Sequence, residues 1–137
     1  MLRLDQATAL ESVDDTLYVG FNEDVELLSF PKLKTVGGAL IIENNAMLKE
    51  VHLPALEHVE KYLHIHDNNS LTIVEMPRLK LVGGELSLAT NPSLTGVAIG
   101  SAQAPTSTAR VETRKNGAEQ LAGLHAHARD SDSPQSK

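Results

Sequence analysis

Two closely spaced histidines near the middle of the chain are the residues whose type and spacing best suit chemistry. His64 and His66 are separated by one residue, so on a β-strand both imidazoles would project from the same face. Glu43 precedes His66 by 23 residues and would be a third ligand if the chain repeats with that period. Three such side chains could chelate a metal ion, but histidine pairs are common on protein surfaces, and no residues supply the hydrogen bonds that orient metal ligands. We therefore expect neither a metal site nor another cofactor.

The sequence motifs of known catalytic classes are missing. The chain contains no cysteine, which excludes thiol chemistry, disulfides and cysteine-based zinc sites. It also contains no nucleophile elbow, no glycine-rich phosphate loop and no pair of carboxylates that recurs at one face. We expect that the protein is not an enzyme.

The residues that would position the two histidines belong to a repeat of 23 residues. Apolar residues recur in step along residues 10–99, without an insertion. The clearest columns are Leu10, Leu33, Leu56 and Leu79; Val13, Val36, Val59 and Val82; Leu17, Leu40, Leu63 and Leu86; and Val19, Ile42, Ile65 and Leu88. Such a repeat predicts a solenoid, in which each turn buries its apolar side only against its neighbours.

The spacing inside one repeat predicts short strands and no helix. Leu40 and Ile42 lie two residues apart, as do Val51 and Leu53, which is the period of a β-strand. Glycine pairs such as 37–38 precede a strand, where a corner requires a positive φ or a close approach of two backbones. The fold class that we predict is therefore all-β, a parallel β-helix of 23-residue turns, with about four repeats in residues 1–100.

One column contains only asparagine: Asn22, Asn45, Asn68 and Asn91. An asparagine at a corner between strands can bond loop backbone groups, and stacked copies form a ladder that satisfies buried amides. We expect these four residues to have a structural role. Asn68 also begins an Asn-Asn-Ser glycosylation sequon, but a ladder residue is buried, so modification is not expected there.

The side chains that point outward from the strand at residues 63–66 and its equivalents are free to carry function. The outward positions of the four repeats are Thr16, Tyr18 and Gly20; Ala39, Ile41 and Glu43; Tyr62, His64 and His66; and Glu85, Ser87 and Ala89. Exposed aromatic and apolar residues on a rigid sheet are typical of binding hot spots. We expect the centre of a partner surface at Tyr18, Ile41, Tyr62, His64 and His66. The alternative is an ordinary solvated sheet face.

Charge and composition limit the partners. Residues 1–100 contain 7 basic and 14 acidic residues, a net charge of −7, which argues against nucleic acid or an anionic membrane surface. A second outward face carries Lys32, Lys34, Arg78 and Lys80 with Glu57 between them. This face could take an anionic glycan, but alternating charges also keep a solenoid soluble, and we favour that interpretation. No apolar run approaches the length of a membrane span, and the N-terminus lacks the features of a signal peptide.

The segment FPKLKTVGGALIIENNAMLKEVHLPALEHV resembles the receptor L domain, a leucine-rich repeat of insulin- and growth-factor-receptor ectodomains that is also found in fungal cell-wall proteins. The resemblance covers residues 10–100 and rests on core positions such as Leu33, Leu40, Asn45 and Pro54. It implies a right-handed parallel β-helix at the cell surface or outside the cell, presenting a sheet to a protein or glycan. The flanking cysteines of the family and a recognisable N-terminal cap are absent here.

The two ends of the chain carry weaker expectations. Leu2 aligns with Val25, so the chain starts in mid-turn, and a partner chain could cover that open end. Residues 101–137 are expected to form a flexible tail with a possible short helix over 118–128. The function expected from the whole sequence is a non-catalytic recognition module for a protein or glycan. The alternative is a structural spacer, or a fragment of a longer repeat protein, without a ligand site.

Overall fold

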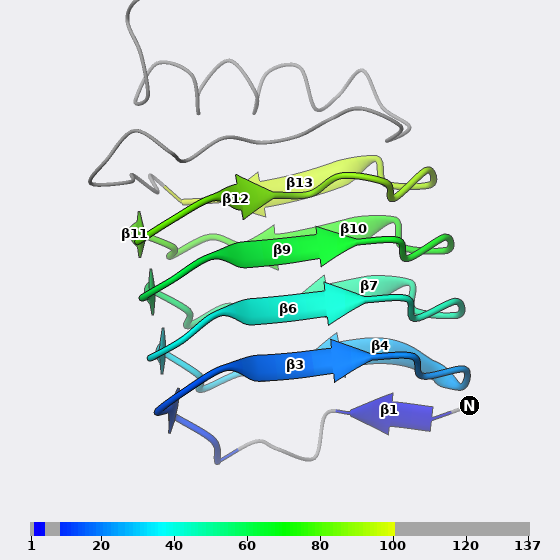
Figure 1. The fold of residues 1–137 in the computed structure, drawn as a ribbon. Helices are drawn as coiled ribbons and strands as arrows, with labels where there is room; N and C mark the ends of the chain where they lie inside the picture. Colours follow the sequence, from blue (N-terminus) through cyan, green and yellow to red (C-terminus); the bar gives the residue numbers. More distant parts are fainter. Residues whose placement is uncertain (1, 5–8, 101–137) are drawn as a thin grey trace, which may run out of the picture.

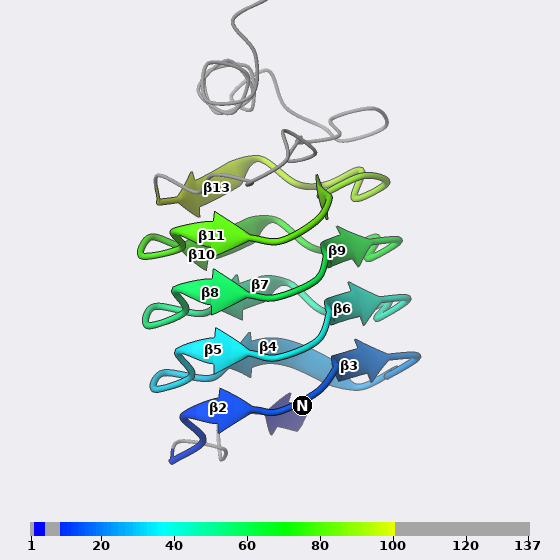
Figure 2. The ribbon, with the colours of Figure 1, turned by 60° about the vertical axis from the view of Figure 1, so that its left-hand side comes forward.

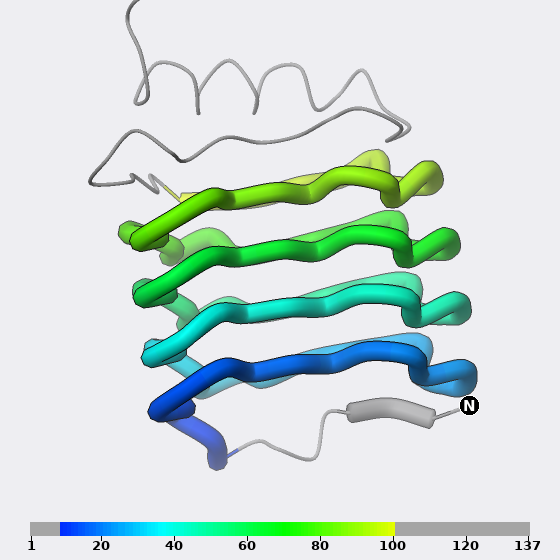
Figure 3. Tube along the Cα trace, in the orientation of Figure 1, coloured from blue at the N-terminus to red at the C-terminus, as the bar shows by residue number. Residues whose placement is uncertain are grey.

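The computed structural model describes residues 2–4 and 9–100 of the 137-residue chain. These residues form an all-β parallel solenoid of about four turns, and successive turns are related by 23 residues (Figure 1). The turns stack as near-parallel layers along one axis (Figure 3). The predicted fold class and repeat length are therefore confirmed. The tail, with its possible helix over 118–128, lies outside the described residues.

Three parallel sheets wrap around the core, and we name them by their place in Figure 1 and Figure 2. The front sheet consists of β3 (Leu17–Gly20), β6 (Leu40–Glu43), β9 (Leu63–His66) and β12 (Leu86–Ser87). The back sheet consists of β1 (Leu2–Leu4), β4 (Val25–Ser29), β7 (Glu50–His52), β10 (Ile73–Met76) and β13 (Gly96–Ile99). The side sheet consists of β2 (Ser12–Val13), β5 (Thr35–Val36), β8 (His58–Val59) and β11 (Leu81–Val82).

The sheet register places equivalent residues of the repeat side by side. Leu40 pairs with Leu63, and Ile42 pairs with Ile65, each one period apart. At the N-terminal end, Leu2 pairs with Val25 in the same way. A 23-residue separation in sequence therefore becomes a single strand spacing in space, roughly 4.8 Å.

The core is a stack of aliphatic side chains, one layer for each turn. Leu33, Leu56 and Leu79 are fully buried, as are Val36, Val59 and Val82. Each such side chain stabilises the fold by about 1.5–3 kcal/mol through its removal from water. Phe30 is the one aromatic residue among the buried side chains of the described part of the chain.

The glycine pairs serve close backbone approach. No described glycine has a positive φ. A Cβ at Gly83 would overlap the carbonyl oxygen of Glu60 on the preceding turn, and a Cβ at Gly37 would overlap that of Asp14. The sequence allowed two reasons for these glycines, a positive φ or a close approach of two backbones. The structure shows the close approach.

The left-handed backbone conformation instead occurs at four residues that are not glycine. Phe21, Asn44, Asp67 and Thr90 have φ of 57°, 58°, 62° and 60°. Each precedes an asparagine of the repeated column, at the corner where the chain leaves the front sheet. Asparagine and aspartate tolerate this conformation, whereas it is an outlier for phenylalanine and for β-branched threonine. The sequence did not predict this feature.

Among the described residues, no helix is long and apolar enough to cross a membrane.

Candidate functional site

The outward face of the front sheet carries all five residues expected to form the partner surface. Tyr18 pairs with Ile41, and Ile41 pairs with His64 on the next strand. His66 pairs with Glu43 in the adjacent row. Tyr62 precedes β9 directly and is exposed, like Tyr18, whereas Ile41 and the two histidines are half-buried.

Two residues expected to point outward on this face are buried. Ala39 is 2% exposed and Ser87 is 6% exposed. Both are small side chains beside bulkier residues at the equivalent position of a neighbouring turn: Ala39 lies next to Tyr62, and Ser87 pairs with His64. The alternation of a strand predicts which way a side chain points, but its exposure depends on the size of its neighbours.

Three rings follow one another on the outward face of β9 and of Tyr62, the residue that precedes it. The ring centroids of Tyr62 and His64 are 4.5 Å apart, and those of His64 and His66 are 5.3 Å apart, with tilted planes in both pairs. These are distances at which aromatic rings attract one another. The result is a continuous aromatic stripe that we call the β9 stripe (Tyr62, His64 and His66).

Carboxylates flank the β9 stripe on both neighbouring turns. His64 Nε2 lies 3.0 Å from Glu85 Oε1 on the following turn, and His66 Nδ1 lies 3.2 Å from Oδ2 of Asp67, the next residue of its own turn. Glu43, which the sequence offered as a third metal ligand, is farther away: its Oε1 lies 3.9 Å from His66 Nδ1. No group of three or more histidine, aspartate or glutamate side chains in the described part of the chain is placed to hold a metal ion.

Tyr18 extends the same surface across the first turn. Its hydroxyl donates a hydrogen bond to Glu43 Oε2 at 2.8 Å, and its ring lies against Gly20, where a Cβ would collide with it. The hydrogen bond to Glu43, with smaller contributions from burial and from the charge of Glu43, raises the pKa of Tyr18 above its ordinary value. Glu43 thereby ties Tyr18 to the strand that pairs with β9.

The asparagine column forms a hydrogen-bonded ladder beside this face. Asn45 and Asn68 each donate their side-chain amide to the Oδ1 of the next asparagine, at 3.1 Å and 3.2 Å. The same Nδ2 atoms donate to the carbonyl oxygens of Val19 and Ile42 on the preceding turn. Asn68 is 0% exposed, so the asparagine of the sequon is buried and bonded.

The basic face is partly paired. Lys32, Lys34, Arg78 and Lys80 are all exposed, and Lys80 Nζ lies 3.7 Å from Glu57 Oε1. Such a pair on the surface contributes little to stability, but it reduces the positive charge that an anionic partner would meet.

Two candidate sites were not found from the sequence. On the back sheet, His52 lies between Glu50 on its own strand and Glu75 on β10, with nitrogen–oxygen distances of 2.7 Å and 2.8 Å. Their 23-residue separation could have revealed His52 and Glu75 as neighbours. The second site is a hollow next to the left-handed corners, beside the exposed Phe21. Asn44 and Asp67, which directly precede the ladder residues Asn45 and Asn68, were the signal in the sequence that could have indicated this hollow.

The geometry of the front sheet suits contact with another molecule. The rings of Tyr18, Tyr62, His64 and His66 supply apolar area, and their polar atoms can form hydrogen bonds with a partner. Comparisons of this chain with protein-family models, with curated proteins and with solved structures find no match.

Proposed function

We propose that this protein is a non-catalytic recognition module that binds a protein or glycan partner through the outward face of the front sheet. The observation that supports this most directly is the β9 stripe, in which three neighbouring rings with tilted planes lie on a parallel sheet. Tyrosine and other aromatic side chains are enriched among the residues that dominate binding energy. A stripe already held in place loses little freedom on binding, which favours affinity.

The receptor L domain resemblance agrees with this role. In that family a leucine-rich β-helix presents a sheet to a protein or glycan at the cell surface. We propose the same surroundings for this chain, on the strength of the core positions that it shares with the family and of its parallel solenoid architecture.

A structural spacer is the second candidate, and one observation favours it. Tyr18, His64 and His66 already have carboxylate partners within the chain, as side chains of an ordinary solvated face would. Under this alternative the front sheet would contribute rigidity and solubility but no partner site.

The experiment is a screen of the full chain against arrays of extracellular proteins and glycans. Each hit is then measured again with a Tyr62→Ala, His64→Ala double variant and with Thr35→Ala, a control on the exposed side sheet. We expect the double variant to lose at least about tenfold in affinity, and the control to lose none. Hits that bind both variants equally would contradict the proposed surface, and an absence of hits on both arrays would favour the spacer.

A further inference from the structure

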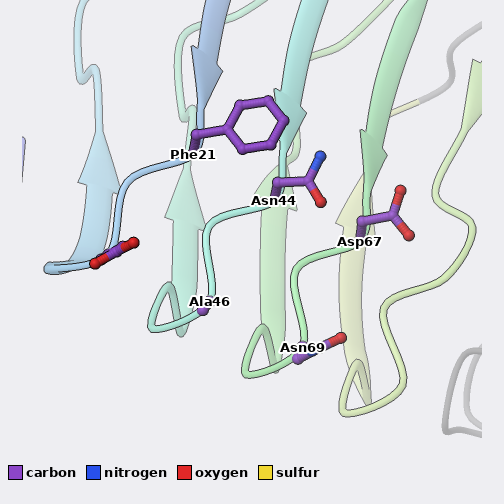
Figure 4. Close-up of a pocket in the computed structure, with 6 residues that line it drawn as sticks. Phe21, Asn44, Ala46, Asp67 and Asn69 are labelled. Carbon is purple, nitrogen blue, oxygen red and sulfur yellow. The ribbon is translucent and has the colours of Figure 1, made fainter.

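A hollow at the corner after the front sheet combines one exposed aromatic ring with amide and carboxylate groups. It has a volume of about 270 Å³ and is lined by Phe21, Glu23, Asn44, Ala46, Asp67 and Asn69. Phe21, Asn44 and Asp67 project in the same direction from three successive turns, with Ala46 and Asn69 on the loops below them (Figure 4). The hollow is therefore a shallow trough that runs across the turns.

Phe21 is hard to explain as a folding residue. Its side chain is 68% exposed, the largest exposure among the large hydrophobic residues that the structure describes as exposed. Its φ of 57° is a conformation that costs free energy in a bulky residue. The same conformation recurs at Asn44, Asp67 and Thr90, so the repeat imposes it, and the feature particular to Phe21 is a bulky, exposed ring at this corner. An exposed ring at the edge of a hollow is suited to stack on a flat apolar face of a ligand.

The polar side of the hollow is rigid. The backbone amides of Phe21 and Asn44 donate to the carbonyl oxygens of Glu43 and His66 on the next turn. Asn44 and Asp67 each precede a buried asparagine of the ladder, so the chain is fixed on both sides of them. His66 Nδ1 lies 3.2 Å from Asp67 Oδ2 and orients this carboxylate. The backbone at Asn44 and the carboxylate of Asp67 are thus held in place before a ligand arrives.

The charges of the hollow determine which ligand fits. Its lining contains the carboxylates of Glu23 and Asp67 and no cationic side chain, which disfavours phosphate, sulfate and nucleic acid. A metal cation is also disfavoured. Glu23 and Asp67 lie two turns apart, roughly 9–10 Å along the backbone, whereas oxygen ligands lie about 2.5 Å from a calcium ion.

We propose that the hollow binds a neutral saccharide ring. The C–H face of the sugar would stack on Phe21, and its hydroxyl groups would exchange hydrogen bonds with the side chains of Asn44, Asp67 and Asn69. The hollow is smaller and more polar than most small-molecule pockets, which suits a ring rich in hydroxyl groups better than an apolar ligand. This inference does not rest on the partner surface of the front sheet: Tyr62 and His64 do not line the hollow, and His66 is connected to it only through Asp67.

The test is a titration of the isotopically labelled full chain, followed by amide NMR. The probes are the neutral β-1,4 and β-1,3 tetrasaccharides of glucose and the α-1,2 tetrasaccharide of mannose, with a sulfated heparin tetrasaccharide for comparison. We expect at least one neutral probe to shift the backbone amides of Asn44 and Asp67 and the side-chain amides of Asn44 and Asn69, and the heparin fragment to leave them unchanged.

Variants make the result specific. Phe21→Asn removes the ring but keeps a residue that accepts the left-handed conformation, and it should weaken saccharide binding about tenfold, an effect on the scale of one lost aromatic contact. Thr90→Asn is the matched control, since it lies in the same backbone position outside the hollow. Phe21→Trp should retain binding, and the Tyr62→Ala, His64→Ala double variant should not alter it.

Three results would overturn the inference: no shift at these amides with any neutral probe, binding that survives Phe21→Asn unchanged, or stronger binding of the heparin fragment. Shifts confined to front-sheet residues would also overturn it while leaving the proposed function in place. Conversely, the saccharide could bind in the hollow while the hits of the array screen bind the Tyr62→Ala, His64→Ala double variant as well as they bind the control. That result would contradict the proposed partner surface but not this inference.

Discussion

The backbone amide and the side-chain amide of Asn45 both donate to one atom, the Oδ1 of Asn68, at 3.1 Å. Asn68 in turn donates from the same two groups to the Oδ1 of Asn91, at 3.1 Å and 3.2 Å. One side-chain oxygen thus satisfies two buried donors of the preceding turn. In the middle of the solenoid no water can replace it, because Asn45, Asn68 and Asn91 are fully buried.

We therefore predict that Asn68→Ala lowers the free energy of unfolding by about 3 kcal/mol or more. The substitution leaves the backbone N–H of Asn45 and one N–H of its side-chain amide without an acceptor, at about 1–3 kcal/mol each, while the amide keeps its bond to the carbonyl oxygen of Val19. Urea denaturation followed by circular dichroism measures the loss. Asn69→Ala, at the exposed neighbouring position, is the control and should change stability by less than about 0.5 kcal/mol. Equal effects of the two variants would contradict a structural ladder.

Asn22→Ala should cost less than Asn68→Ala. Asn22 is only half-buried, and within the described residues its hydrogen bonds run to Asn45 alone. We expect a loss of about 1 kcal/mol, measured in the same denaturation experiment.

The glycine pair at residues 83–84 offers a test of close packing between turns. A Cβ at Gly83 would overlap the carbonyl oxygen of Glu60, whereas a Cβ at Gly84 would lie 3.2 Å from the carbonyl oxygen of Lys61. Gly83→Ala should therefore destabilise the protein by about 1–3 kcal/mol, because the backbone of one turn must move. Gly84→Ala should lower the free energy of unfolding clearly less, because the carbonyl oxygen of Lys61 needs to move by only a few tenths of an ångström. A thermal melt of both variants would show the difference, and the reverse order of melting temperatures would disprove the argument.

Replacement of Phe21 by asparagine should stabilise the fold. The substitution relieves the left-handed strain of a bulky residue, which is on the order of 1–3 kcal/mol, and the exposed ring contributes little packing in return. We expect a gain of about 1 kcal/mol in the free energy of unfolding, measured by urea denaturation. Asn44→Ala is the opposite change at the equivalent position: it replaces a residue that tolerates the left-handed conformation by one that does not, and it should lower the free energy of unfolding. A loss of stability in Phe21→Asn would mean that the ring packs against the fold after all.

The environment of His52 predicts a pH-dependent contribution to stability. Burial disfavours the charged imidazole and lowers its pKa, but the hydrogen bonds to Glu50 and Glu75 and the charges of both carboxylates outweigh burial and raise the pKa of His52 above 6.5. The residue that faces it from β4 in the register is the uncharged Ser29. The folded protein therefore binds this proton more tightly than the unfolded chain does.

The resulting stability is fully present below the unfolded pKa of 6.5 and is lost as the pH rises through the raised folded pKa. We expect His52→Gln to destabilise the protein more at about pH 5.5 than at about pH 8.5, because the carboxylates are ionised at both values. Urea denaturation at the two pH values gives the comparison, and an NMR titration of the His52 ring gives its pKa directly. Glu75→Gln should bring that pKa down. An unchanged pKa in Glu75→Gln would rule out the ion pair as its cause.

Much of the fold could be predicted from the order of residues alone. The 23-residue columns of leucine, valine and asparagine determine the register, because an apolar side chain is stable only when it stacks on its equivalent in the next turn. The two-residue period within a strand placed Tyr18, Ile41, Tyr62, His64 and His66 on one face, and the structure brings them to that face. These features depend on local spacing repeated many times, so sequence is sufficient to reveal them.

Other features were decided only when the turns packed against one another. The burial of Ala39 and Ser87, the bonding of His64 to Glu85 and the position of His52 between two carboxylates depend on the size and rotamer of side chains on adjacent turns. The left-handed corner at Phe21 is the clearest case. The bulky side chain of Phe21 disfavours that conformation, which Asn44 and Asp67 adopt more readily at the equivalent positions. Phe21 adopts it because Phe21 and Asn22 form hydrogen bonds with the following turn. The repeat sequence thus determined the solenoid, and contacts between turns determined the shape and chemistry of its surface.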